Sequence, residues 1–346
     1  MIGDTAWQLQ LGDYVTTLAL SPDGDLLVAG SLAGDAVLVT VDGSLVRTLT
    51  EHPMGVLSAA WSPDGTRLAV GGHDGRVRTY GRDGIEIGML AGTAWIAQVA
   101  WSPDGSLLAI ADGRRLAVCD SDATLVHRFP AASSTITAVA WATNGRRVGI
   151  TSYGGVSWYD TDHLPVETPS RTHTFKGSPL ALALAPNGKW ACAGFQDSSI
   201  HLWRLWSGDD LSMSGYPAKI EHLAFRDDSH WMASACLDEL TVWDFSGKGP
   251  KGSRPATGNA HDRHISCLAW EPGGTRLLSG GADGRLVMWP SPRSVNRPLE
   301  PQDVHEGETA VATVVWHPSG ASVLVGRADG ALEQRSIGPT ASPRMR

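Results

Sequence analysis

A repeat of 40 to 46 residues constrains this chain more than any other feature of its sequence. Eight segments share one plan, in which an alternating apolar strand ends in an aromatic residue or leucine and is followed by a tight turn and a second apolar strand. The residues that end the first strands are Leu20, Trp61, Trp101, Trp141, Leu184, Phe225, Trp270 and Trp316. This period is typical of a four-stranded propeller blade, so we expect an all-β fold of eight such units.

The turn after each first strand carries residues that reverse a chain tightly. Its clearest copies read SPDG, at 21–24, 62–65 and 102–105. Proline fixes φ at the first corner, aspartate bonds its own backbone, and glycine accepts the positive φ. A second tight turn, HDGR at 73–76 and ADGR at 282–285, predicts a second hairpin. Each unit therefore supplies strands A, B and C, with A–B turns on one face (the bottom) and B–C turns on the other (the top).

Closure of the ring follows from counting strands. Eight A–B–C units need eight outer D strands, but only seven segments join them. Residues 7–11 alternate with period two, so we predict that residues 5–11 form the outer strand of the last blade. The expected architecture is a single domain over 1–337, a closed eight-bladed propeller, with a seven-bladed ring as the alternative. We expect a disordered tail over 338–346 and a long loop over 249–260.

The chain resembles the WD40-repeat β-propeller family, and its bacterial eight-repeat members in particular. The resemblance covers residues 5–337 and rests on Trp243-Asp244, the near match Trp158-Tyr159-Asp160, and the HDG and ADG turns. It implies a hydrogen-bonded tetrad of His, Ser or Thr, Asp and Trp in each complete blade. Only the seventh repeat has all four, which are His261, Ser279, Asp283 and Trp289.

Two other repeats keep part of the tetrad and are expected to depend more on packing. The second repeat has His52 and Asp74, with Val70 and Tyr80 at the remaining positions. The eighth repeat has His305 and Asp329, with Val325 and Arg335 at the remaining positions.

Charge and composition disfavour several classes of partner. The net charge of −8 offers no basic field for nucleic acid or for an anionic membrane. The N-terminus has no signal-peptide pattern and no apolar run reaches 18 residues, so we expect a cytoplasmic protein. The four cysteines, at 119, 192, 236 and 267, lack CxxC spacing and are expected to be buried thiols.

Catalytic and metal-binding signals are weak. The sequence contains no nucleophile elbow, HExxH motif or phosphate-binding loop, so we expect neither an enzyme nor a bound cofactor. His261, His264 and Cys267 have a spacing that would suit a metal ion. The tetrad position of His261 and the strand position of Cys267 favour a structural role instead.

The family resemblance implies a rigid disc that binds peptides or domains through its top face. We therefore expect a monomeric, non-catalytic interaction scaffold with a protein or peptide partner. The alternative is an accessory factor in a metal or cofactor pathway that acts with a CobW-type GTPase. Aromatic and arginine side chains dominate binding energy at interfaces. The top-face candidates are Tyr14, His73, Trp95, Tyr153, Phe195, Lys219, Arg263, His264 and Arg327.

Overall fold

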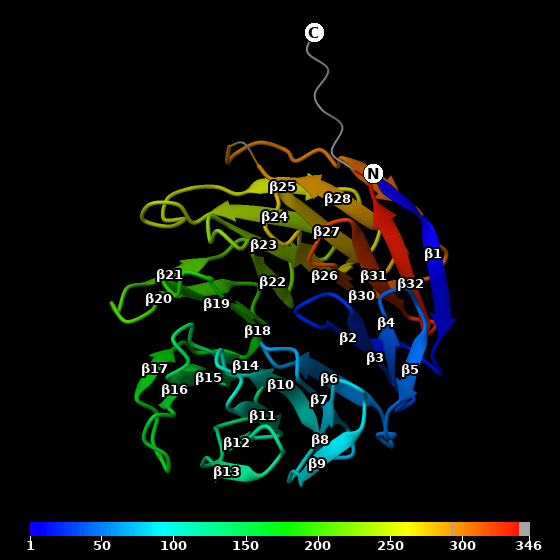
Figure 1. Ribbon diagram of the computed structural model, residues 1–346. Coiled ribbons are helices and arrows are strands. Elements are labelled where there is room, and N and C mark those ends of the chain that lie inside the picture. The colour runs from blue at the N-terminus through cyan, green and yellow to red at the C-terminus, as the bar shows by residue number, and fades with distance from the viewer. Residues whose placement is uncertain (293, 339–346) are drawn as a thin grey trace.

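The computed structural model describes residues 1–292 and 294–338, and the described chain folds into eight four-stranded antiparallel sheets. The sheets stand around a central axis as the blades of a propeller (Figure 1). All eight A strands end at the residues that the repeat predicts. The eight-bladed prediction is thus confirmed. Within residues 1–292 and 294–338, no helix has the length and hydrophobicity needed to cross a membrane.

Blades 1 to 4 run in chain order from an inner A strand to an outer D strand. Their strands are β2 (Val15–Leu20), β3 (Leu26–Ser31), β4 (Ala36–Thr40) and β5 (Leu45–Thr48); β6 (Val56–Trp61), β7 (Arg67–Gly72), β8 (Arg76–Gly81) and β9 (Glu86–Ala91); β10 (Ile96–Trp101), β11 (Leu108–Asp112), β12 (Arg115–Cys119) and β13 (Leu125–Arg128); and β14 (Ala138–Trp141), β15 (Arg147–Ser152), β16 (Gly155–Asp160) and β17 (Arg171–Thr174).

Blades 5 to 7 follow the same order, and blade 8 takes its outer strand from the N-terminus. Their strands are β18 (Pro179–Leu184), β19 (Trp190–Phe195), β20 (Ile200–Arg204) and β21 (Asp210–Met213); β22 (His222–Phe225), β23 (Trp231–Cys236), β24 (Glu239–Asp244) and β25 (Ala256–Asn259); β26 (Ile265–Trp270), β27 (Arg276–Gly281), β28 (Leu286–Pro290) and β29 (Asp303–His305); and β30 (Val311–Trp316), β31 (Ser322–Arg327), β32 (Ala331–Ile337) and β1 (Ile2–Gln10).

Strand β1 closes the ring by pairing antiparallel with β32, which lies beside it in Figure 1. The register runs from Ile2 opposite Ile337 to Gln10 opposite Ala331, so the strand starts earlier than the predicted residue 5. The indole N–H of Trp7 donates to the carbonyl oxygen of Val41 in blade 1, at 2.8 Å. Strand β30 of blade 8 also contacts β2 of blade 1. The N-terminal strand therefore belongs to the last blade and is bonded to the first.

Indole hydrogen bonds join neighbouring blades near the axis. Five A strands end in a tryptophan whose N–H donates, over 2.9–3.2 Å, to a carbonyl oxygen on the A strand of the preceding blade. The pairs are Trp61 to Ala19, Trp101 to Ala60, Trp141 to Ala100, Trp270 to Ala224 and Trp316 to Ala269. The apolar core is likewise divided into clusters between adjacent blades, such as the one shared by blades 1 and 2.

The expected loop over 249–260 is wrong at its end, because Ala256–Asn259 form the outer strand β25. Ala256 is buried in the core, and Gly258 lies directly against the Trp289 ring, where a side chain would collide. Pairing and packing therefore outweigh the low strand propensity of this stretch. The tail predicted to be disordered lies outside the described residues except for Gly338, whose N–H donates to the carbonyl oxygen of Met1.

Deleting residues 1–11 should lower the melting temperature by on the order of 10 °C, because blade 8 loses its outer strand and the link from Trp7 to blade 1. Adding a synthetic peptide of residues 1–11 in excess should restore most of the loss. Differential scanning calorimetry of the deleted and full-length chains measures both effects. A melting temperature unchanged within one or two degrees would show that ring closure does not depend on β1.

Two buried histidines lie between blades 4 and 5. His173 is on β17 and His201 on β20, where the His201 ring stacks on Phe175 with centroids 3.4 Å apart. Nε2 of His173 and Nδ1 of His201 have no hydrogen-bond partner among the described residues. Burial, with a smaller effect of the nearby Arg171 charge, lowers the pKa of His173 to about 4, and burial also lowers the pKa of His201. Both side chains are therefore neutral in the folded protein at pH 7.

Acid should destabilise the fold through these histidines. An unfolded histidine binds a proton below about pH 6.5, whereas folded His173 does so only near pH 4, so its contribution is complete above 6.5 and is lost as the pH falls between these values. Urea titrations at pH 7 and pH 5 should show that His173 lowers the free energy of unfolding by about 2 kcal/mol at the lower pH. His173→Phe should be less sensitive over this range, and an identical pH dependence in both proteins would refute the assignment.

Candidate interaction surface

A recurring backbone hydrogen bond fixes the loops of the top face. In six blades, the residue that follows strand B donates its N–H to the carbonyl oxygen of the residue just before strand A, 18 positions earlier, over 2.8–3.1 Å. The donor and acceptor pairs are Leu32 and Tyr14, His73 and Gly55, Gly113 and Trp95, Gln196 and Ser178, Ala282 and His264, and Ala328 and Ala310. The two loops of each of these blades are thus held as one unit, and a partner that binds them has little loop disorder to overcome.

Most of the predicted top-face residues are exposed on the loops of the top face. The exposed fraction is 44% for Trp95 and 49% for Tyr153, which stand at the entrance to β10 and in the turn between β15 and β16. The exposed candidates are Tyr14, His73, Trp95, Tyr153, Lys219, Arg263 and His264. They come from blades 1, 2, 3, 4, 6 and 7 and therefore surround the mouth of the ring rather than form a single cluster.

Phe195 and Arg327 were wrongly expected on this surface, since both are buried. Phe195 packs edge-on against Phe175 with ring centroids 4.9 Å apart. Arg327 forms an ion pair with the buried Glu333 at 2.6 Å and donates to the carbonyl oxygen of Thr309. Each is the last residue of its B strand, and the turn begins one residue later. The prediction failed because it placed the strand boundary one position too early.

Three exposed apolar residues of the top face were missed. Leu32 lies in the B–C turn of blade 1, Met54 in the loop that enters β6, and Leu237 in the B–C turn of blade 6. Met54 is 75% exposed with φ of 78°, and Leu237 is 50% exposed with φ of 53°. A left-handed backbone costs a non-glycine residue about 1–2 kcal/mol. Together with Tyr14, Trp95 and Tyr153, these three residues form the set that we call the top-face apolar residues. An aliphatic side chain at a turn position is the sequence feature by which the three could have been predicted.

Two hollows open beside members of this set. One has a volume of about 260 Å³ and is lined by Leu237 together with Lys219, Glu221, His222 and His264. The ammonium of Lys219 pairs with Glu221 at 2.9 Å. The other hollow, of about 530 Å³, is lined by Tyr153, Gly154, Thr174, Phe175 and Lys176. The surface thus combines apolar anchors with a few charged groups, as protein interfaces do.

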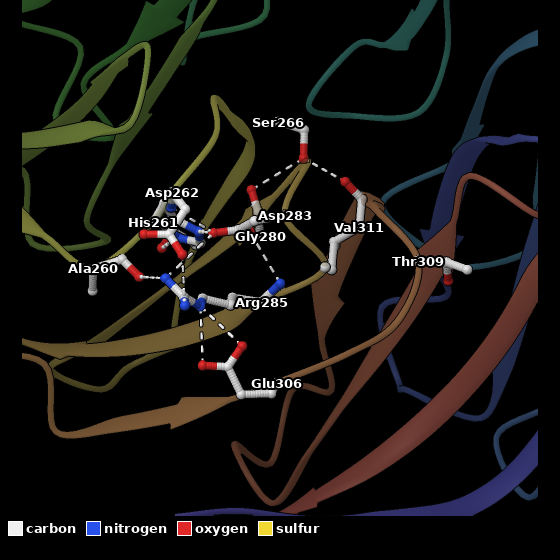
Figure 2. Close-up of polar contacts among 12 residues, drawn as sticks. Ala260, His261, Asp262, Ser266, Gly280, Asp283, Arg285, Glu306, Thr309 and Val311 are labelled. Carbon is white, nitrogen blue, oxygen red and sulfur yellow. Dashed lines mark hydrogen bonds and ion pairs between the residues drawn. The ribbon is translucent and has the colours of Figure 1, made fainter.

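The four tetrad residues of blade 7 come together below this surface. His261 Nδ1 donates to Asp283 at 3.2 Å, Ser279 donates to His261 Nε2 at 2.8 Å, and the Trp289 indole donates to Ser279 at 2.8 Å. Burial lowers the pKa of His261 despite the neighbouring carboxylate, so the ring is neutral. Figure 2 shows Asp283 beside His261 and Asp262, from both of which it accepts a hydrogen bond, and Arg285 reaching Glu306. The network ties the D–A loop to the B–C turn.

Other blades use different buried groups at the same place. In blade 2, His52 and Arg78 both contact Asp74, at 3.0 and 3.3 Å. In blade 6, the hydroxyl of Tyr216 accepts a hydrogen bond from Trp243 at 2.8 Å.

Blade 8 departs from its expected partial tetrad, since exposed Asp329 binds its own turn at the N–H of Ala331 instead of reaching His305. Glu333 lies between Arg327 and Arg335, and these three side chains form a buried ion network in place of the tetrad.

The metal-ligand reading of His261, His264 and Cys267 finds no support in the geometry. Both ring nitrogens of His261 are engaged in the tetrad, and His264 is exposed. Cys267 is buried, and burial raises the pKa of its thiol to about 12. In the described ranges, no group of three His, Cys, Asp or Glu side chains is close enough to hold a metal ion.

Comparison with known families gives a direct match. A family model described as WD domain, G-beta repeat matches residues 9–38, 43–80, 169–204 and 252–290. Each matched segment runs from the outer strand of one blade through the A, B and C strands of the next.

Curated relatives match shorter stretches of the chain. The small ribosomal subunit protein RACK1 of Schizosaccharomyces pombe is 28% identical over 38% of this chain and 42% of its own length. RACK1y of Oryza sativa is 28% identical over 32% of this chain and 33% of its own length. Actin-interacting protein 1-2 of Arabidopsis thaliana is 28% identical over 37% of this chain and 21% of its own length. The alignments therefore span less than half of each relative.

Solved structures share the complete fold. The Sqt1 protein of Chaetomium thermophilum superposes with a TM-score of 0.84 at 19% identity, covering 97% of this chain and 98% of Sqt1. The C-terminal WD40 domain of Sif2 gives 0.80 at 18% identity, covering 98% and 99%. Sqt1 bound to the N-terminus of the ribosomal protein L10 gives 0.81 at 18% identity, covering 97% and 100%.

Replacing His261 with alanine should lower the free energy of unfolding by about 1–3 kcal/mol, because Ser279 and Asp283 each lose a buried partner. His264→Ala is the matched control, since this exposed histidine lies three residues away on the same loop. Urea denaturation of both variants makes the comparison. Equal stability of the two variants would mean that the tetrad does not contribute.

Proposed function

We propose that this eight-bladed β-propeller, four segments of which match the WD domain, G-beta repeat model, is a non-catalytic scaffold that binds a protein or peptide through its top face. The proposal includes a monomeric protein that acts in the cytoplasm without a cofactor. The single observation that carries it is the set of six exposed top-face apolar residues, four of which lie on loops that the repeated backbone hydrogen bond holds in place, namely Tyr14, Leu32, Met54 and Trp95.

Strain supports a functional reading of two of these residues. Met54 and Leu237 combine a left-handed backbone with an exposed apolar side chain, and neither feature stabilises the folded monomer. Glycine or asparagine would satisfy the backbone without placing an apolar group in water. A cost of this kind is offset when the side chain becomes buried against a partner.

The nature of the partner is supported by proteins with the same fold. Sqt1 has been captured with the N-terminus of a ribosomal protein, which is a polypeptide segment rather than a small molecule. The hollows beside Leu237 and Tyr153 are open and lined by short polar and apolar groups, which suits side chains that project from such a segment. These parallels favour a peptide or a protein loop as the ligand of this chain.

The test removes two anchors without disturbing the fold. Trp95→Ala combined with Met54→Gly should weaken binding of the principal partner at least about tenfold, since each buried anchor contributes about 1.5–3 kcal/mol. Glycine suits the left-handed backbone at position 54, so the melting temperature should be unchanged or slightly higher. Quantitative affinity purification from the source cells, followed by mass spectrometry, identifies the partner and measures its recovery.

Asp64→Asn combined with Asp104→Asn is the matched control, because both residues lie in A–B turns on the bottom face. The control should recover the partner as the unmodified protein does. Loss of the partner in the control, with full recovery in the top-face variant, would assign binding to the opposite face.

A further inference from the structure

A second apolar surface lies on the outer edge of the propeller, away from the top face. Seven aliphatic side chains on the outer strands of blades 1 to 3, or in the turns that lead into them, are 41–59% exposed. These residues, which we call the outer apolar strip, are Leu45, Val46, Ile85, Ile87, Met89, Leu125 and Val126. Ile85, Ile87 and Met89 alternate and so project from one side of β9 and its turn.

The other five blades show that the fold does not require this pattern. Their outer strands are β17, β21, β25, β29 and β1. Among the described residues of these five strands and of the turns that lead into them, two large apolar side chains are exposed, Val304 on β29 at 38% and Trp206 before β21 at 39%, and neither lies beside another exposed aliphatic side chain. An exposed apolar edge strand is an aggregation hazard that proteins ordinarily avoid. The concentration of exposed aliphatic side chains on three adjacent blades therefore indicates a surface that another molecule covers.

Contacts between neighbouring blades link the three edges. The guanidinium of Arg47 donates to the carbonyl oxygen of Asp83 at 2.9 Å, and the hydroxyl of Thr50 donates to Glu86 at 2.7 Å. Arg67 of blade 2 pairs with Asp122 of blade 3 at 3.4 Å. Strands β5, β9 and β13 are each the last strand of their sheet, so one side of their backbone faces outward.

The stretch of chain that contains the strip is acidic. Residues 1–130 carry 15 acidic and 8 basic side chains, a net charge of −7, whereas the rest of the chain carries −1. None of the five lysines lies in residues 1–130.

Of the nearby arginines, Arg82 pairs with Asp23 at 2.5 Å and Arg128 with buried Asp112, whereas exposed Arg47 on β5 donates to a backbone carbonyl. Asp42 and Asp83 form no ion pair within the described part of the chain, and they line an open hollow of about 650 Å³ between blades 1 and 2.

We propose that the outer apolar strip binds a cationic amphipathic segment of a partner protein. Aliphatic side chains on the segment cover the strip, and its lysines or arginines face the surrounding carboxylates. A second copy of this chain would bring two acidic surfaces together, and an anionic membrane would be repelled for the same reason. The surface is separate from the top face, so this inference stands or falls independently of the proposed function.

Three synthetic peptides of about 18 residues can test the two components of this recognition. The first peptide places leucines on one face of a helix and lysines on the opposite face. The second replaces each lysine with glutamate, and the third replaces each leucine with serine. Isothermal titration of the full chain should show that the leucine–lysine peptide binds at least about tenfold more tightly than either of the others. Raising the salt concentration should weaken that binding.

Ile87→Ser combined with Met89→Ser should weaken binding of the leucine–lysine peptide about tenfold while the melting temperature stays unchanged, because both side chains are already half-exposed. Trp95→Ala on the top face is the matched control and should bind this peptide normally. Binding that is lost in the control but kept in the double variant would overturn the proposal. So would equal or absent binding of all three peptides.

Analytical ultracentrifugation of the unmodified chain and of the double variant decides between a partner and a second copy. The proposal predicts a monomer for both proteins at micromolar concentration. A dimer of the unmodified chain that disappears in the Ile87→Ser, Met89→Ser variant would show that the strip is covered by another copy and would refute the proposed occupant.

Discussion

The pairing of β1 with β32 is the constraint on which the rest of the structure depends. It brings residues 2–10 against residues 331–337, and it gives blade 8 the fourth strand that the repeats themselves do not supply. Trp7 then links the same strand to blade 1. A ring closed in this way has no free inner edge, so each A strand packs between two neighbours and the indole hydrogen bonds can repeat from blade to blade.

Rigidity of the top face follows from this closed ring. The A strands fix one end of each D–A loop, and the repeated backbone hydrogen bond attaches the B–C turn of six blades to that end. Below the loops, the blades use different buried groups for the same purpose, such as the His261–Asp283 pair in blade 7 and the Arg327–Glu333 pair in blade 8. The buried residues that support the loops can therefore differ between blades while the position of the loops is kept. The exposed turn residues can then differ from blade to blade without moving the loops.

The repeat in the sequence predicts the backbone well because each blade depends on local turns and alternating strands. All eight A-strand ends are found at the expected residues, and the N-terminal strand closes the last blade as expected, although it begins three residues earlier. The candidate site was predicted less well. Phe195 and Arg327 are buried rather than exposed because the B strands end one residue later than predicted. Strand β25 forms in a stretch whose composition indicated a loop.

The exposure of Met54, Leu237 and the outer apolar strip could not be predicted either, because a pattern of apolar residues does not show which of them a neighbouring blade covers. The Arg327–Glu333–Arg335 network was missed because it replaces a family motif with residues from the same strand pair. Burial at these positions depends on contacts between distant parts of the chain.

The most direct test of the scaffold assignment is site-specific photo-crosslinking in the source cells, with a photoreactive phenylalanine analogue placed at position 95, 54 or 64. Trp95 and Met54 belong to the top-face apolar residues, whereas Asp64 lies in a turn of the bottom face. The account predicts that positions 95 and 54 capture the same protein and that position 64 does not. Capture of that protein from position 64 alone, or capture of different proteins from 95 and 54, would contradict it.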